Sequence, residues 1–325
     1  MHVTREQLET FLDRVRSQTK DPKAGLFGPG SMMWMIGREM IGGLGGGRAL
    51  LLQTAHPFVA HAVEQHSRVR EDPHGRGERT FKNVLAMNFG DLEAALRAAR
   101  RVHAVHERIH GKITERIGAY DLGTPYDAND DDALLWVHAT LWDTSVQMYE
   151  LIVRPLSSEE KEKYYQETKL FAYLFGVPDR IIPPNWNEFM DYNRKMWESD
   201  ILTVGKPSAE IAHFVLQPPK PELQPVMDWF KIITAGLMPR RIRHEYRFPY
   251  GAAEKAVFEA SIRALRAAYP RLHRRLRFSP AYIKARERMG MAYPTGPVDS
   301  WLGRFMDRQM GQPGLTVPAA ARSAA

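Results

Sequence analysis

The chain contains no cysteine among its 325 residues. This absence excludes disulfide bonds, iron–sulfur clusters, thiolate-ligated haem and cysteine zinc sites. Any bound metal must therefore use His, Asp, Glu or Tyr ligands. Long apolar runs are also missing, since stretches such as residues 49–52 are far shorter than the roughly 20 residues that span a bilayer. The N-terminus lacks the apolar segment of a secretory signal, so we expect a cytoplasmic protein.

Common catalytic signatures are scarce as well. The G-x-S-x-G elbow of serine hydrolases does not occur. The glycine-rich residues 42–47 are followed by Arg48 rather than by the Lys-Ser/Thr of a phosphate-binding loop, and no strand is predicted before them. We interpret this segment as a place of close helix packing or a mobile turn over a pocket.

The composition is that of a large globular protein, with 44% hydrophobic and 26% charged residues. The formal net charge is +7, with local basic clusters at residues 239–243 and 271–277. No nucleic-acid motif accompanies these clusters, so we expect no nucleic-acid partner. Most of these charges are expected on solvated helix faces, and a peripheral contact with an anionic membrane stays open as an alternative.

Apolar residues recur with helical spacing almost throughout, and alternating strand patterns are nearly absent. The sequence therefore predicts an all-α fold, with one helical domain over residues 1–310 and a disordered tail over 311–325. The predicted helices cover residues 4–17, 48–65, 79–88, 91–117, 132–153, 158–176, 185–199, 207–215, 222–236, 251–268 and 279–289.

The predicted helix 91–117 carries three histidines. At 100° per residue, His106 falls near the middle of the apolar arc, while His103 and His110 lie towards one side. A buried imidazole must gain a partner for the hydration that it loses, either a hydrogen bond or a metal. Glu107-x-x-His110 copies half of a di-iron carboxylate site, but a second copy is missing.

A second buried imidazole is predicted at His138, which shares a helix face with Leu134, Leu141 and Trp142. It has two interpretations, as part of a hydrogen-bond network or as a ligand of the cofactor. His56, His61 and His66 recur at steps of five, which rotate around a helix and therefore do not make one ligand face. We expect His56 to cap a helix or line a pocket at the turn before Pro57.

Several segments resemble the superfamily of latex-clearing proteins (rubber oxygenases) and MpaB-type oxygenases, especially its poorly characterised actinobacterial branch. The matching segments run in order over roughly residues 28–290. They are Gly47-Arg-Ala-Leu-Leu-Leu-Gln-Thr-Ala-His-Pro57, His66-Ser67, Asp72-Pro-x-x-Arg76-x-x-x-Thr80, Val102-x-x-x-His106, Tyr126-Asp-Ala-Asn129, Leu135-Trp-Val-His-Ala-Thr-Leu141, and Tyr269-Pro with Ser279-Pro-Ala-Tyr282. The resemblance implies an all-helical domain with a globin-like core and one b-type haem.

The resemblance also implies a proximal iron ligand. The R-x-x-H-x-x-V-R helix of the rubber oxygenases falls on His103-x-x-His106-x-x-Ile109-His110. This makes His106 the expected iron ligand. His103 and His110 replace the two flanking arginines beside the haem, and His138 is expected as a further cofactor contact.

On the opposite side of the haem, the resemblance places the family's R-x-x-K-T pattern on Arg76-Gly-Glu-Arg79-Thr80. A lysine can lose its proton and ligate iron, whereas the guanidinium of Arg79 stays protonated and cannot. We therefore expect a sixth iron position that lysine does not close. Arg76 and Arg79 are expected to donate hydrogen bonds to dioxygen, and Thr80 to orient a proton.

These observations predict a haem b-dependent oxygenase that acts with O2 on a small apolar substrate, either unsaturated or isoprenoid. Three alternatives stay open: a peroxidase-like haem protein, a non-catalytic protein that binds haem or a lipophile, and a metal-free helical binding protein. The substrate, the electron donor and the oligomeric state do not follow from the sequence.

Overall fold

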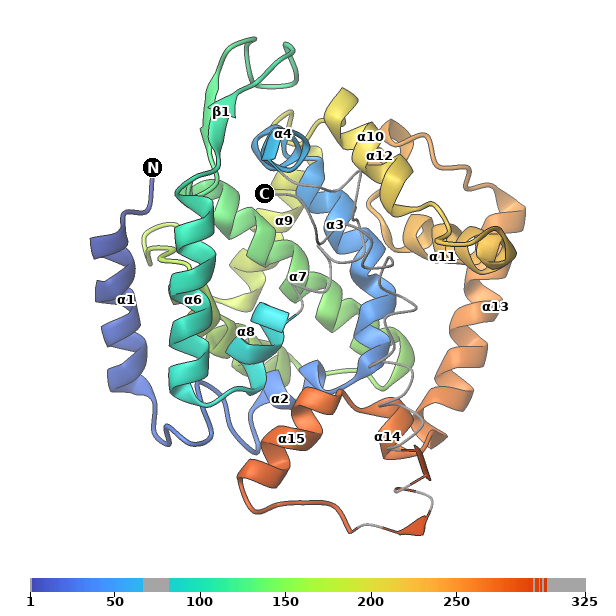
Figure 1. Ribbon diagram of the computed structural model, residues 1–325. Helices are drawn as coiled ribbons and strands as arrows, with labels where there is room; N and C mark the ends of the chain where they lie inside the picture. Colours follow the sequence, from blue (N-terminus) through green and yellow to red (C-terminus); the bar gives the residue numbers. More distant parts are fainter. Residues whose placement is uncertain (1, 67–81, 295, 298, 300, 303–325) are drawn as a thin grey trace, which may run out of the picture.

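Helices form nearly all of the regular structure in the computed structural model, which describes residues 2–66, 82–294, 296, 297, 299, 301 and 302 (Figure 1). The predicted all-α fold is thereby confirmed, and the globin-like character of its core stays a prediction. The predicted tail over 311–325 lies outside the described residues. So do Arg76, Arg79 and Thr80.

The helices follow the predicted order closely. Their bounds are α1 (Arg5–Gln18), α2 (Met32–Gly37), η1 (Met40–Gly45), α3 (Gly46–Thr54), α4 (Pro57–His66), α6 (Leu92–His106), α7 (Asp131–Ile152), α8 (Ser158–Tyr173), α9 (Trp186–Glu198), α10 (Lys206–Val215), η2 (Pro221–Leu223), α11 (Gln224–Leu237), α12 (Arg240–Glu245), α13 (Ala252–Ala268), η3 (Tyr269–Arg271), α14 (Arg274–Arg277) and α15 (Pro280–Arg288). Residues 82–89 are also helical. Two short strands, β1 (His110–Lys112) and β2 (Pro125–Asp127), form an antiparallel pair.

Local capping chemistry explains why the helices start where they do. At α8, the Ser157 hydroxyl accepts a hydrogen bond from the Glu160 backbone N–H, and the Glu160 carboxylate accepts one from the Ser157 N–H. This capping box satisfies two donors that the helix itself cannot pair. At α7, the Asp130 side chain accepts from the Ala133 N–H at 2.9 Å. Both starts were predicted from the sequence and are confirmed.

Two predicted helices have different ends in the structure. The helix predicted over 48–65 is two helices, α3 and α4, which meet at a bend before Pro57. Proline is favoured in the first turn of a helix because its missing N–H is not needed there. The helix predicted over 91–117 ends at His106, because the chain then pairs as β1 with β2. Gly111 permits this pairing, since a Cβ there would lie 2.7 Å from the Tyr126 hydroxyl oxygen.

Helix α7 crosses the middle of the molecule, with α6 and α1 on one side and α3 on the other (Figure 1). It packs on η1, α3, α8 and α13. Glycines allow close contacts in this region: a Cβ at Gly45 would lie 2.5 Å from Thr144 Cγ2 in α7, and one at Gly47 in α3 would lie 2.3 Å from Thr234 Oγ1 in α11. The interpretation of this segment as a place of close helix packing is therefore confirmed at Gly45 and Gly47, whereas a Cβ at Gly42, Gly43 or Gly46 would meet nothing within 4 Å.

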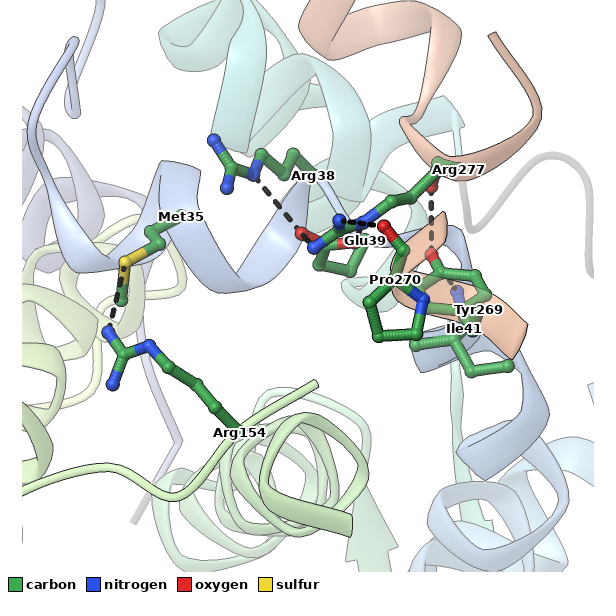
Figure 2. A network of polar contacts seen from close by, with 8 residues as sticks. All are labelled: Met35, Arg38, Glu39, Ile41, Arg154, Tyr269, Pro270 and Arg277. Carbon is green, nitrogen blue, oxygen red and sulfur yellow. Dashed lines mark hydrogen bonds and ion pairs between the residues drawn. The ribbon is translucent and has the colours of Figure 1, made fainter. Parts of the chain in front are cut away.

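A buried carboxylate ties the C-terminal segment to the start of the fold (Figure 2). Glu39 accepts hydrogen bonds from Arg277 Nε at 2.7 Å and Nη2 at 2.9 Å, and from Arg38 Nε at 3.2 Å. The Tyr269 hydroxyl donates to the Arg277 carbonyl at 2.8 Å and accepts from the Ile41 N–H at 3.1 Å. Residues far apart in the sequence are therefore held by one ionic network.

No helix in the described part of the chain combines the length and the apolar character that crossing a membrane requires.

Candidate functional site

His138 lies in α7 with only 1% of its surface exposed, which confirms its predicted burial. Its imidazole is enclosed by aromatic rings: Phe175 at 4.3 Å, Trp142 at 5.3 Å and Phe171 at 5.4 Å between ring centroids. Among the residues that the structure describes, no group forms a hydrogen bond with its Nδ1 atom. A buried polar atom of this kind indicates a partner beyond the described side chains, such as a cofactor or water.

The surroundings of His138 also determine its charge. Burial, and to a smaller extent the nearby His106, lower its pKa to about 3. The ring is therefore neutral near pH 7. Neutral imidazole is the form that ligates a metal and that both donates and accepts hydrogen bonds.

His106 is the last residue of α6 and is half-buried. It contributes to the lowered pKa of His138, so the two imidazoles lie within electrostatic range of one another, although they come from different helices. The prediction that His106 lies near the middle of the apolar face of its helix is wrong, because Val105, expected on that face, is 58% exposed. The buried stripe of α6 is instead formed by Leu92, Ala95, Leu96, Ala98, Ala99 and His103.

The other two histidines of the predicted cluster have different surroundings. His103 is buried, and its Nε2 lies 2.9 Å from the Val3 carbonyl, so this imidazole ties α6 to the N-terminal segment. Its Nδ1 faces the Glu107 carboxylate at 3.6 Å. His110 is exposed in β1. The structure therefore places His106 within electrostatic range of His138, while His103 contacts the N-terminal segment and His110 is exposed.

Residues 106–110 spell H-E-x-x-H, which in zinc proteases places two histidines one turn apart on a helix. Here α6 ends at His106 and His110 belongs to β1. The helical spacing that the zinc motif requires is absent from this described segment. The motif is therefore a coincidence of sequence.

A second group of histidines lies at the bend between α3 and α4. His56 is buried, and its Nδ1 accepts a hydrogen bond from the Phe58 N–H at 3.2 Å. Its Nε2 lies 3.5 Å from the Tyr120 hydroxyl, and burial lowers its pKa to about 4. His61 Nδ1 lies 2.8 Å from the Pro57 carbonyl. His56 lies between α3 and α4 rather than on one helix with His61, and the contacts of these two histidines stabilise the bend.

The acidic residues Asp130, Asp131 and Asp132 are close enough to form a cation site by distance alone. Two of these carboxylates already have structural roles, because Asp130 caps α7 and Asp131 pairs with Arg180. We therefore assign no metal to this cluster.

A buried ion pair positions α7 against α3. Arg48, only 2% exposed, donates to Asp143 and to Thr144, each at 2.5 Å, and to the Leu237 carbonyl at 2.9 Å. Asp143 directly follows Trp142, which contacts His138. This network therefore holds the helix that carries the candidate site.

The sequence did not identify Phe171 and Phe175 as walls of the site. Their i, i+4 spacing on and just after α8 is a usable signal, because it places two aromatic rings on one face. The contact of that face with His138 depends on how α8 packs on α7, and periodicity does not report it.

The donor set fits a haem-type cofactor. Its requirements are a neutral imidazole nitrogen and apolar surroundings that exclude water. His138 has both, and His106, at the end of α6, lies within electrostatic range of it.

Comparison with known proteins identifies the family of the chain. Residues 33–267 match the family described as "ER-bound oxygenase mpaB/B'/Rubber oxygenase, catalytic domain". Two uncharacterized proteins, from Mycobacterium bovis and Mycobacterium tuberculosis, are each 23% identical to the chain over 227 residues, which is 67% of this chain and 85% of theirs. No solved structure matches significantly. The chain belongs to the mpaB and rubber oxygenase family, and residues 33–267 form an oxygenase-type catalytic domain.

Proposed function

We propose that the protein is a haem b-dependent oxygenase that acts with O2 on an apolar, unsaturated or isoprenoid substrate. The observation that carries this proposal is the buried imidazole of His138, which Phe171, Phe175 and Trp142 enclose and which lies within electrostatic range of His106, in a chain of an oxygenase family.

In this proposal His106 holds the iron. His106 is the last residue of α6, and its side chain is only half-buried. The imidazole of the nearby His138 is neutral. A haem held by histidine would supply the activation of dioxygen when bound. The aromatic rings around His138 keep water out and so strengthen hydrogen bonds at the site.

His138 has a supporting role in this proposal, orienting a bound group through its Nδ1 atom. A neutral ring donates from one nitrogen and accepts at the other, so it can hold a proton in place without adding charge. The deep burial of His138 favours one rival assignment, in which His138 is the iron ligand and His106 is the supporting group.

Arg76, Arg79 and Thr80, which lie outside the described residues, are proposed to donate hydrogen bonds and a proton near the reacting oxygen. Because a guanidinium stays protonated, Arg79 cannot become an iron ligand as a lysine can. An Arg79→Lys variant is therefore expected to acquire a new ligand at alkaline pH, which its optical spectrum would reveal.

The optical spectrum of the purified protein tests the cofactor. A Soret band in the wild type is expected to be lost or strongly shifted in His106→Ala and retained in His213→Ala, which removes an exposed imidazole on α10. A protein that binds no haem even after reconstitution would refute the proposal. Retention of the band in His106→Ala with loss in His138→Ala would transfer the ligand role to His138.

Oxygen uptake separates an oxygenase from a binding protein. The haem-loaded protein is expected to consume O2 in the presence of an isoprenoid alkene, and wild type and His213→Ala should do so equally. A stable haem with no uptake on any alkene would favour a non-catalytic haem protein. Turnover with peroxide alone would instead favour a peroxidase-like activity.

A further inference from the structure

A cleft of about 500 Å³ lies away from the histidine pair, between α12 and the segment that joins α9 to α10. Thr203 and Val204 line one side, and His244, Glu245, Arg247 and Phe248 line the other. Neither the predicted cofactor residues nor the aromatic rings around His138 contribute to it. The cleft is therefore a separate feature of the fold.

Arg247 has an unusual backbone at this cleft, with φ at +56°, and it is the only residue other than glycine with positive φ in the described ranges 2–66 and 82–294. Helix α12 ends there in a Schellman motif: the Arg247 N–H donates to the His244 carbonyl at 2.9 Å, and the Phe248 N–H donates to the Arg243 carbonyl at 3.2 Å. Glycine is the usual residue at this position because a Cβ is disfavoured. An arginine here indicates a use for its side chain.

No carboxylate among the residues that line the cleft forms an ion pair with the Arg247 side chain. Glu245, the one acid among the lining residues, is already engaged: its carboxylate pairs with Arg241 and accepts a hydrogen bond from the Val204 N–H at 2.9 Å. Arg247 and His244 are exposed, and neither has an ion-pair partner in the part of the chain that the structure describes. The cleft therefore presents a guanidinium and an imidazole that no carboxylate neutralises.

Apolar groups lie beside these polar ones. Val204, Phe248 and Pro249 line the same cleft, and Phe248 is half-buried against Tyr246. A ligand that fills the space must therefore combine a negative charge with an apolar body. Inorganic anions meet only the first requirement.

We propose that this cleft binds a small organic anion, a carboxylate or a phosphate ester, through Arg247 and His244, with its apolar body against Phe248. A guanidinium suits both anions because its fork of donors matches their oxygens. The proposal does not depend on haem, since none of its residues belongs to the candidate cofactor site.

Titration of the purified full-length protein with phenyl phosphate and with benzoate tests the site, followed by calorimetry or by NMR. The chain provides a clean variant, because Arg247→Gly removes the guanidinium and relieves the left-handed backbone. We expect it to weaken binding by roughly tenfold or more, as for loss of a charge-assisted hydrogen bond. Its melting temperature should equal or exceed that of the wild type. Arg263→Ala, which removes an exposed arginine on α13, is the matched control and should bind as the wild type does.

Three outcomes would overturn the proposal. The first is the absence of saturable binding of either probe, and the second is equal binding by Arg247→Gly and the wild type. The third is binding of inorganic phosphate as tight as that of phenyl phosphate, because an apolar contact with Phe248 would then contribute nothing. If only phenyl phosphate or only benzoate binds, the ligand is a phosphate ester or a carboxylate, respectively.

Discussion

Acid should destabilise the protein through His138, because this imidazole is buried and uncharged in the folded chain. Burial holds its pKa at about 3, whereas the same group in the unfolded chain titrates near its ordinary value of 6.5. The unfolded state therefore binds more protons than the folded state between these two values. The stability that His138 contributes is fully present above pH 6.5 and is lost as the pH falls towards 3.

The size of this effect follows from the width of the pH window. Each unit by which the pH falls inside this window lowers the free energy of unfolding by about 1.4 kcal/mol. Between pH 6.5 and pH 4.5 the expected loss from His138 is therefore about 2 kcal/mol. His56, whose pKa burial lowers to about 4, adds a loss in the same direction. The contribution of His138 must therefore be measured as a difference between variants.

Urea unfolding of the cofactor-free protein at the two pH values gives that difference. His138→Leu removes the titrating group and keeps nearly the same volume, so its loss of unfolding free energy should be about 2 kcal/mol smaller than that of the wild type. His213→Leu is the matched control, because its ring is exposed to water in the folded protein, and its loss should equal that of the wild type. A His138→Leu protein that loses as much stability as the wild type would refute the assignment of His138 as a buried neutral imidazole.

Two further predictions concern packing and ion pairs elsewhere in the fold. Gly47→Ala should lower the unfolding free energy by about 1–3 kcal/mol, because the new Cβ would lie 2.3 Å from Thr234 Oγ1, whereas the neighbouring Gly46→Ala meets open space and should raise it by about 0.5–1 kcal/mol. Equal effects of these two substitutions in urea unfolding would contradict the packing argument. Glu39→Gln should lower the free energy of unfolding by about 2 kcal/mol, because it leaves Arg277 and Arg38 around a neutral amide. Both arginines are partly exposed, which keeps this loss below that of a fully buried ion pair. Urea unfolding of Glu39→Gln with no loss of stability would show that the network of Figure 2 contributes little.

Features that depend on neighbouring residues in the sequence were predictable. The start of α8 follows from the reciprocal bonds of Ser157 and Glu160, and the start of α7 follows from Asp130. The burial of His138 follows from its apolar neighbours along one helix face. Each of these depends on contacts within one helix, and helical spacing reports such contacts directly.

Features that depend on distant contacts were not predictable in the same way. The end of α6 at His106 is set by pairing between β1 and β2, and β2 lies well beyond the helix in sequence. Val105, expected on the apolar face of this helix, is 58% exposed. The aromatic wall around His138 depends on the packing of α8 against α7, and the glycine-like backbone of Arg247 depends on how α12 ends. None of these leaves a periodic signal in the sequence.

Chemical rescue of the proposed iron ligand tests the central claim most directly. Reconstituted with haem, His106→Gly should lose the wild-type Soret band, and added imidazole should restore it by replacing the missing side chain. The same treatment of His138→Gly should leave a His106-ligated spectrum before imidazole is added. Rescue in His138→Gly but not in His106→Gly would contradict the claim that His106 holds the iron.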